Sequence, residues 1–275
     1  MLRERLAATP SEAKWLEHFE SLAATLLGAT ELHIAGQPHQ LCEIEFYLDD
    51  PSHRDPFTHR SEAQRASGRW YFHRIAGSYR GGSFKGLDIS FGPEAAYGGI
   101  LIRSLKCPDG TLVNGCSLCV DHMLAQTGAA SVAALDQRIA ERPVDDPSSP
   151  VALVSREREP ASTIWATARV GLTLKRIAEH PTMPAFIARP YRFLTEPRAI
   201  KKGRTQLIVA LHEAGLDADA IRALCNSPKA SIERCVEAYA AGRELEVESL
   251  HGTKLDAAGL CRLYGALSQI PKPER

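Results

Sequence analysis

The segment Glu43-Ile44-Glu45-Phe46-Tyr47 constrains this chain most, because it places two carboxylates inside an apolar stretch that has the pattern of a β-strand. Alternate residues of a strand share one face, so Glu43, Glu45 and Tyr47 should point the same way. A buried carboxylate costs free energy unless it is paired or used in chemistry. The pattern therefore predicts the wall of a functional site.

The rest of the chain predicts an α+β protein with two domains, residues 1–204 and 205–275. The first domain mixes strand-like apolar runs with amphipathic helices, and the second is helical throughout. We expect strands at 30–35, 40–48, 70–73, 84–91 and 100–105, and helices at 11–28, 117–126 and 132–139. The proline-containing segment 141–160 is expected to be a surface loop.

Three short helices are predicted in the second domain, at 207–214, 217–225 and 229–241. This succession is typical of a helix-turn-helix unit, in which residues 229–239 would form the recognition helix. The alternative is a small three-helix bundle with no role in DNA binding. Residues 204–275 carry nine basic and ten acidic side chains, a balance that disfavours phosphate binding.

The distribution of charge says more about partners than its sum, since 33 basic and 33 acidic residues cancel. Residues 54–106 hold nine Lys or Arg against four Asp or Glu, and residues 189–204 hold six against one. Two basic stretches in a neutral protein suggest contact with a polyanion on one face. The alternative is an ordinary solvated surface.

The start of the chain is a mixed-charge segment without the apolar run of a signal peptide. No stretch approaches the roughly 18–20 apolar residues that a membrane span needs. The seven cysteines are odd in number, in a long chain without an export signal. We therefore expect a cytoplasmic protein with reduced thiols and no membrane partner.

Glu45 is the candidate catalytic residue that the residue types themselves suggest. A strand carboxylate near Tyr47, His59 and His73 and facing Arg103 could hold a water molecule and take its proton. The alternative is a structural Glu–Arg pair, which buried strands also contain. Burial raises the pKa of such an acid and the arginine lowers it, and the sequence leaves open which effect is larger.

A second cluster contains residue types that bind zinc. Cys107, Cys116, Cys119 and His122 follow the spacing C-x8-C-x2-C-x2-H. The alternative is that Cys119 and His122 are successive positions on one helix face, with Cys119 in the core. We expect no metal and no cofactor. No nucleophile elbow and no P-loop occurs in the sequence.

Seven segments, taken in order, resemble the alkyladenine (3-methyladenine) DNA glycosylase family. Residues 43–48 are similar to its E-T-E-A-Y-L strand, and residues 100–105 to its V-L-L-R-A-L strand. The other segments are residues 22–28, the acidic loop 55–59 that ends in a histidine, the hairpin 68–73 with 87–90, residues 113–119, and residues 169–171 with 189–193. The resemblance covers the first domain and excludes residues 205–275.

The resemblance implies a curved antiparallel sheet with surrounding helices, and hydrolysis of the N-glycosidic bond of a flipped base in double-stranded DNA. Glu45 falls on the general base that activates water for attack on the sugar. Arg103 falls on the arginine near that water and the target phosphate. Val170 falls on a residue whose backbone carbonyl also holds the water. No lysine or terminal amine lies in these motifs, so no lyase step is expected.

The base pocket implied by the resemblance consists of Tyr47, His59 and His73, which would sandwich the flipped base. Asp88 stands where the family has Asn. An ionised Asp can only accept hydrogen bonds, so it would favour a base that presents an amino group or a protonated nitrogen. The substrates could be alkylated bases in repair or deliberately modified bases, for instance on invading phage DNA.

The hairpin that carries the intercalating residue of the family is longer and richer in glycine here. Tyr79 is the candidate wedge, and Arg80 is its competitor. Arg192, Lys201 and Lys202, in the second basic stretch, are candidate DNA contacts. The alternative from a different class is a non-catalytic DNA-binding or regulatory protein that uses the same fold and the helix-turn-helix tail.

Overall fold

The computed structural model describes residues 2–10, 14–156, 163–251 and 255–270, and these form two compact units. The sheet unit comprises Met1–Arg54, Thr58–Ile164 and Phe193–Thr195, and the helical unit comprises Asp55–Phe57, Trp165–Arg192 and Glu196–Arg275. The predicted α+β class with an antiparallel sheet is confirmed. Among the described residues, no helix has the length and apolar character needed to cross a membrane.

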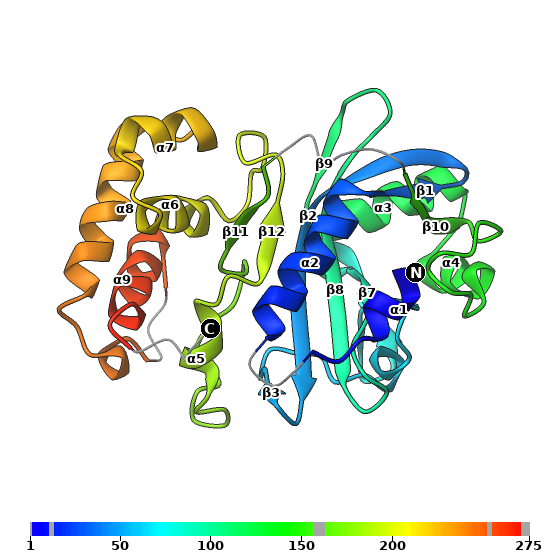
Figure 1. The fold of residues 1–275 in the computed structure, drawn as a ribbon, viewed down its shortest axis with the longest axis horizontal. Coiled ribbons are helices and arrows are strands. Elements are labelled where there is room, and N and C mark those ends of the chain that lie inside the picture. The colour runs from blue at the N-terminus through cyan, green and yellow to red at the C-terminus, as the bar shows by residue number, and fades with distance from the viewer. Residues whose placement is uncertain (1, 11–13, 157–162, 252–254, 271–275) are drawn as a thin grey trace. The chain divides into compact units, whose positions relative to one another are not determined.

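Six antiparallel strands form the main path of the sheet, in the order β10-β1-β2-β8-β7-β4 (Figure 1). Two short strands pair beside this path, β3 with β2 and β9 with β8. A separate hairpin pairs β5 with β6. The bounds are β1 Thr30–Ile34, β2 Gln37–Asp50, β3 His53–Arg54, β4 Trp70–Phe72, β5 Arg74–Ile75, β6 Ser78–Tyr79, β7 Leu87–Ser90, β8 Tyr97–Lys106, β9 Leu112–Asn114, β10 Val151–Ser155 and β12 Arg192–Leu194.

Helix α2 (Trp15–Gly28) covers the apolar face of this sheet and packs against β1 and β2 (Figure 1). Its apolar residues recur every three to four positions, which gives the helix one continuous buried stripe. Phe19 stacks on Phe46 of β2 at a ring-centroid distance of 4.7 Å, and Phe91 meets both rings edge-on. Burial of each such aromatic ring stabilises the fold by roughly 1.5–3 kcal/mol.

Of the remaining helices of the sheet unit, the first precedes all the strands and the others lie between strands in the sequence. They are α1 Leu2–Ala7, α3 Cys116–Thr127 and α4 Val132–Ile139, with 3-10 turns at Glu62–Arg65 and Gly82–Phe84. The expected helix 132–139 is confirmed residue for residue. The Ser131 hydroxyl caps it by accepting the backbone N–H of Ala134.

The expected surface loop at 141–160 is corrected in its second half, because Val151–Ser155 form β10 at the edge of the sheet. Leu153 pairs with Leu32 of β1, and both side chains are buried. The run Val151-Ala152-Leu153-Val154 has the apolar character of a strand, which the prolines before it obscured. The segment 157–162 lies outside the described residues.

The helical unit has a core of its own, and this core starts earlier in the chain than the expected boundary at residue 204. Leu174, Met183 and Ile187 share it with the buried faces of the C-terminal helices. The elements are β11 Trp165–Thr167, α5 Met183–Ile187, α6 Arg204–Glu213, α7 Ala218–Cys225, α8 Lys229–Gly242, a 3-10 turn at Val247–Leu250, and α9 Ala257–Leu267. The sequence did not indicate α9.

Helices α8 and α9 approach each other closely enough for their backbones to touch. A Cβ on Gly265 would lie 2.0 Å from the carbonyl oxygen of Tyr239, and a Cβ on Gly242 would lie 2.1 Å from that of Arg262. A disulfide joins Cys235 of α8 to Cys261 of α9. The expectation that all seven thiols are reduced is therefore wrong for these two.

Substitution of Gly265 by alanine tests the α8–α9 contact. We expect a loss of about 1–3 kcal/mol in the free energy of unfolding of the helical unit, because the new methyl group meets backbone that cannot rotate away. Urea unfolding followed by circular dichroism measures this loss. Gly81→Ala is the control, since a Cβ there meets nothing within 4 Å. Equal stability of the two variants would contradict the predicted contact.

Candidate active site

One face of the sheet carries a row of side chains that is polar on three strands, β2, β7 and β4, and crosses β8 at a leucine. Residues directly opposite each other in antiparallel strands share a face. The register pairs Glu45 with Leu101, Leu101 with Asp88, and Asp88 with Tyr71. Glu45, Asp88 and Tyr71 therefore lie on the same side of the sheet. The neighbouring row points into the apolar core and consists of Phe46, Ile100, Ile89 and Trp70.

The acid cluster, which consists of Glu43, Glu45, Tyr47, Arg103 and Ser104, occupies the β2–β8 part of this face. Oε2 of the fully buried Glu45 accepts from the Tyr47 hydroxyl at 2.8 Å and from Nη1 of Arg103 at 3.2 Å. Arg103 also donates from Nε to Glu43 at 3.0 Å. The Ser104 hydroxyl donates to the second oxygen of Glu43 at 2.6 Å. One guanidinium thus lies between two carboxylates, which gives the three groups a formal charge of −1.

A β-bulge arranges these side chains. The register between β2 and β8 shifts on both sides of Glu43, which pairs with Ser104. In a regular strand, Arg103 and Ser104 would point to opposite faces, yet both donate to Glu43. Bulges redirect side chains in this way and are frequent beside functional sites. The sequence contains no local signal for this bulge.

The two carboxylate partners of Arg103 stabilise its positive charge. Burial alone would lower the pKa of Arg103, but the negative charges of Glu45 and Glu43 outweigh burial and raise this pKa above its usual value. Loss of Arg103 would leave both buried carboxylates without their shared counter-charge, and an uncompensated buried charge typically costs about 3–5 kcal/mol. The cluster is therefore a rigid arrangement that presents an oriented carboxylate.

The structure brings His59 and His73 together, as the sequence predicted. Their ring centroids lie 4.2 Å apart, edge to face. Tyr71, which the sequence analysis did not single out, lies 5.9 Å from His73 and 6.2 Å from His59. Strand alternation was the available signal, because Tyr71 and His73 are two residues apart. The Tyr47 hydroxyl donates to Glu45. The predicted role of Tyr47 in stacking on the flipped base stays a prediction.

Asp88 contacts His73 directly. Nε2 of His73 is 2.7 Å from Oδ1 of Asp88, so the two side chains share a hydrogen bond. Gly99 makes room for this acid, since a Cβ there would lie 2.4 Å from Oδ2 of Asp88. Asp88 therefore orients the His73 ring, and its predicted role in reading the base edge stays a prediction.

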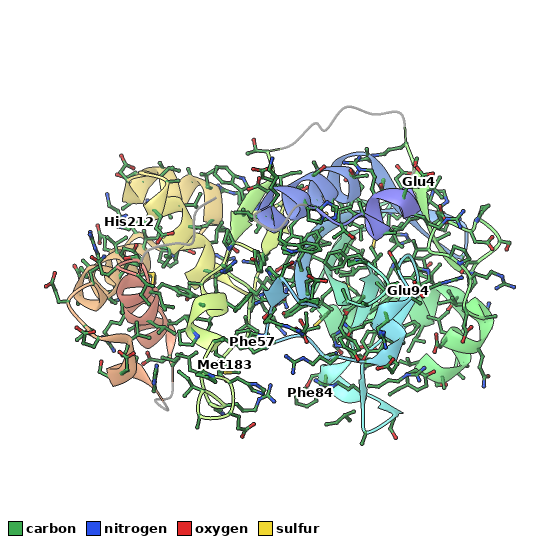
Figure 2. All side chains as sticks on the ribbon, turned by 60° about the horizontal axis from the view of Figure 1, so that its bottom comes forward. Glu4, Phe57, Phe84, Glu94, Met183 and His212 are labelled. Carbon is green, nitrogen blue, oxygen red and sulfur yellow. A yellow bond between two sulfur atoms is a disulfide. The ribbon has the colours of Figure 1, made fainter. Side chains whose placement is uncertain are left out.

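The hairpin beside this group holds Tyr79 in place. The Tyr79 hydroxyl donates to Asp136 at 2.6 Å, and the Arg74 guanidinium lies over the Tyr79 ring at 4.4 Å from its centroid. Intercalation by Tyr79 would have to break these contacts. Two apolar side chains in the same stretch are exposed, Ile75 at 64% and Phe84 at 71%. Phe84 lies at the lower edge of the sheet unit in Figure 2.

The predicted basic contacts differ in how accessible they are. Arg80 donates its backbone N–H to the His73 carbonyl, and its buried Nε has no acceptor among the described residues. Lys201 and Lys202 are exposed. Arg192 is fully buried, and its guanidinium donates to Thr167 and to backbone carbonyls of the helical unit. Complete burial conflicts with the predicted DNA contact of Arg192.

The remaining candidates are Val170 and the possible zinc ligands. Val170 belongs to the helical unit, and its predicted contact with water at Glu45 stays a prediction. Cys107 and His122 do come together, but with His39 and not with Cys116 and Cys119, the other members of the candidate cluster. Cys119 is buried in the core, as the alternative interpretation had it.

No family model matches the chain. The chain is 29% identical over 208 residues to an uncharacterized protein of Acanthamoeba polyphaga mimivirus, and the match covers 70% of this chain and 92% of the relative. The name of that relative assigns it no activity.

Protonation of His59 provides a test of the imidazole pair. Burial first, and then the neighbouring His73, lower the pKa of His59 from 6.5 to about 4. The unfolded chain therefore binds this proton first as the pH falls, so stability decreases between about pH 6.5 and pH 4. NMR titration should give a His59 midpoint near 4, and His73→Gln should move it upward. An unchanged midpoint in His73→Gln would contradict the pairing.

Proposed function

We propose that the sheet unit is a monofunctional DNA glycosylase domain, which hydrolyses the N-glycosidic bond of a flipped, modified base and leaves an abasic site. The observation that carries this proposal is the buried Glu45–Arg103 pair, on a sheet face that also bears the His59–His73 pair. The resemblance of residues 43–48 and 100–105 to the alkyladenine DNA glycosylase family supports the same chemistry.

In the proposed reaction, Glu45 takes a proton from the water that attacks the sugar C1′, and the base leaves with the bonding electrons. The sugar acquires positive charge in the transition state, as in other glycoside hydrolyses. The Glu45 carboxylate, which in this proposal lies nearest the sugar, stabilises such a cation before the water adds. Arg103 keeps the carboxylate oriented. The half-buried Tyr47 is the side chain whose movement would open Glu45 to the substrate.

The residues around His59 favour a base that carries positive charge, that is, an N-alkylated base. The pKa of His59, at about 4, keeps the ring neutral near pH 7, so the ring does not repel a cationic base. Neutral aromatic faces attract cations, and Tyr71 adds a third ring beside the pair. The same side chains also suit a deliberately modified base that bears a protonated group, as on phage DNA.

Substitution of Glu45 by glutamine tests the proposed chemistry. Duplexes with a panel of modified bases are incubated with the protein, and abasic sites are cleaved with alkali. We expect Glu45→Gln to lower base release by about 10²–10⁴-fold, because the amide keeps the shape but cannot take a proton. Glu43→Gln is the matched control, with the same arginine partner, and should lose less than about tenfold.

Two outcomes would contradict the glycosylase proposal: no release from any duplex by the unaltered protein, or undiminished release by Glu45→Gln. The alternative of a non-catalytic DNA-binding or regulatory protein would then be favoured. That alternative predicts duplex binding without cleavage, together with loss of binding when exposed basic residues of the helical unit such as Lys201 and Lys202 are removed.

Phe84 replaces Tyr79 as the proposed wedge, because Phe84 is exposed whereas Tyr79 would have to break its contacts with Asp136 and Arg74. We expect Phe84→Ala to reduce base flipping by between about 5-fold and 100-fold, since stacking of an aromatic ring on a base is worth roughly 1–3 kcal/mol. Fluorescence of a base analogue placed next to the modified base measures flipping. Tyr79→Ala, which removes the ring and the hydroxyl contacts to Asp136 and Arg74, should change flipping little. A large loss in Tyr79→Ala with normal flipping in Phe84→Ala would make Tyr79 the wedge instead.

A further inference from the structure

Three metal-binding side chains meet at the far end of the β2–β8 strand pair. His39 lies near the start of β2, Cys107 directly follows β8, and His122 lies on α3. The register pairs Gln40 with Lys106, so His39 and Cys107 are the next residues outward on the two strands. Glu45 is six residues along β2 from His39, which corresponds to about 20 Å. This group is therefore separate from the acid cluster.

The donor atoms of these side chains point at one another. Nε2 of His39 and Nε2 of His122 are 2.9 Å apart, and Sγ of Cys107 is 3.7 Å from Nε2 of His122. All three donor atoms lie within 4.8 Å of one another. A tetrahedral zinc ion would require about 3.3 Å between two nitrogens and about 3.6 Å between nitrogen and sulfur. The two distances to His122 differ from these values by a few tenths of an ångström.

The orientation of His39 is fixed on the side away from the group. Its Nδ1 lies 2.9 Å from the backbone carbonyl of Gln37, which can only accept, so Nδ1 carries the hydrogen. In the neutral ring, Nε2 then directs its lone pair toward His122 and Cys107. Metal-binding histidines commonly have this outer hydrogen bond to a carbonyl. His39 is also 98% buried, which limits other rotamers.

Cys107 is held by a tight turn. Its backbone N–H donates to the Thr111 carbonyl at 2.8 Å, and its carbonyl accepts from Gly110 at 2.9 Å. Gly110 has φ +85°, a conformation that favours glycine. The turn therefore fixes the direction of the thiol from one strand end, while β2 and α3 fix the two imidazoles.

We propose that His39, Cys107 and His122 bind one Zn²⁺ ion, with a fourth ligand from solvent. Two imidazoles and one thiolate are a ligand set that zinc accepts. Cys107 would bind as thiolate and release one proton to the solvent. The ion would tie α3 to the ends of β2 and β8 and so stabilise the sheet unit. This inference does not depend on the proposed function.

Metal analysis of the purified full-length protein tests the site. After removal of metal with a chelator and titration with Zn²⁺, we expect one ion per chain and a rise in the melting temperature of the sheet unit. Titration with Co²⁺ in place of Zn²⁺ should produce a thiolate-to-cobalt charge-transfer absorption. The alternative is that His39 and His122 form only a hydrogen bond between their rings. In that case neither result is expected.

Matched variants identify the ligands. Cys107→Ser should abolish the cobalt absorption, and His122→Gln should weaken zinc binding by at least about tenfold. Cys116→Ser, a nearby cysteine on α3 outside the group, should keep both signals. Circular dichroism of each variant checks that it folds. The proposal is overturned if the unaltered protein binds no stoichiometric zinc, or if Cys116→Ser loses as much as Cys107→Ser.

Discussion

The polar face of the sheet depends on one guanidinium between two carboxylates. Burial of Glu43 and Glu45 would be costly without Arg103, because isolated charges in a protein interior lose their hydration. The arginine reaches both acids through different nitrogens, and Ser104 satisfies the remaining oxygen of Glu43. The strand pair can therefore keep a carboxylate at a fixed position in its centre, where apolar packing alone would exclude it.

Local alternation in the sequence was sufficient to predict which residues of β2 belong to this site. It did not predict the residues that β7 and β4 contribute. Period-2 spacing placed Glu43, Glu45 and Tyr47 on one face, and the structure agrees. Asp88 and Tyr71 join the same row only through the pairing of β7 with β8 and β4. Such pairing joins residues far apart in the chain, so no local pattern encodes it.

The features that the sequence missed share the same physical cause. Arg192 belongs to a basic stretch, yet it is buried because backbone carbonyls of the helical unit surround its guanidinium. Cys235 and Cys261 are 26 residues apart and meet because glycines let α8 and α9 approach closely. The sequence shows which residues are neighbours along the chain. Tertiary contacts decide which of them are buried and which pair with one another.

The same limit applies to the proposed zinc ligands His39, Cys107 and His122, which we call the His39 group. Sequence spacing made Cys116 and Cys119 candidate zinc ligands, because closely spaced cysteines are the usual signature of a zinc site. Strand register instead brings His39 to Cys107, and the helix supplies His122. The same antiparallel pair, β2 with β8, thus carries the acid cluster in its middle and the His39 group at its end. An ion at that end would resist fraying of both strands, and would thereby hold the register that places Arg103 between Glu43 and Glu45.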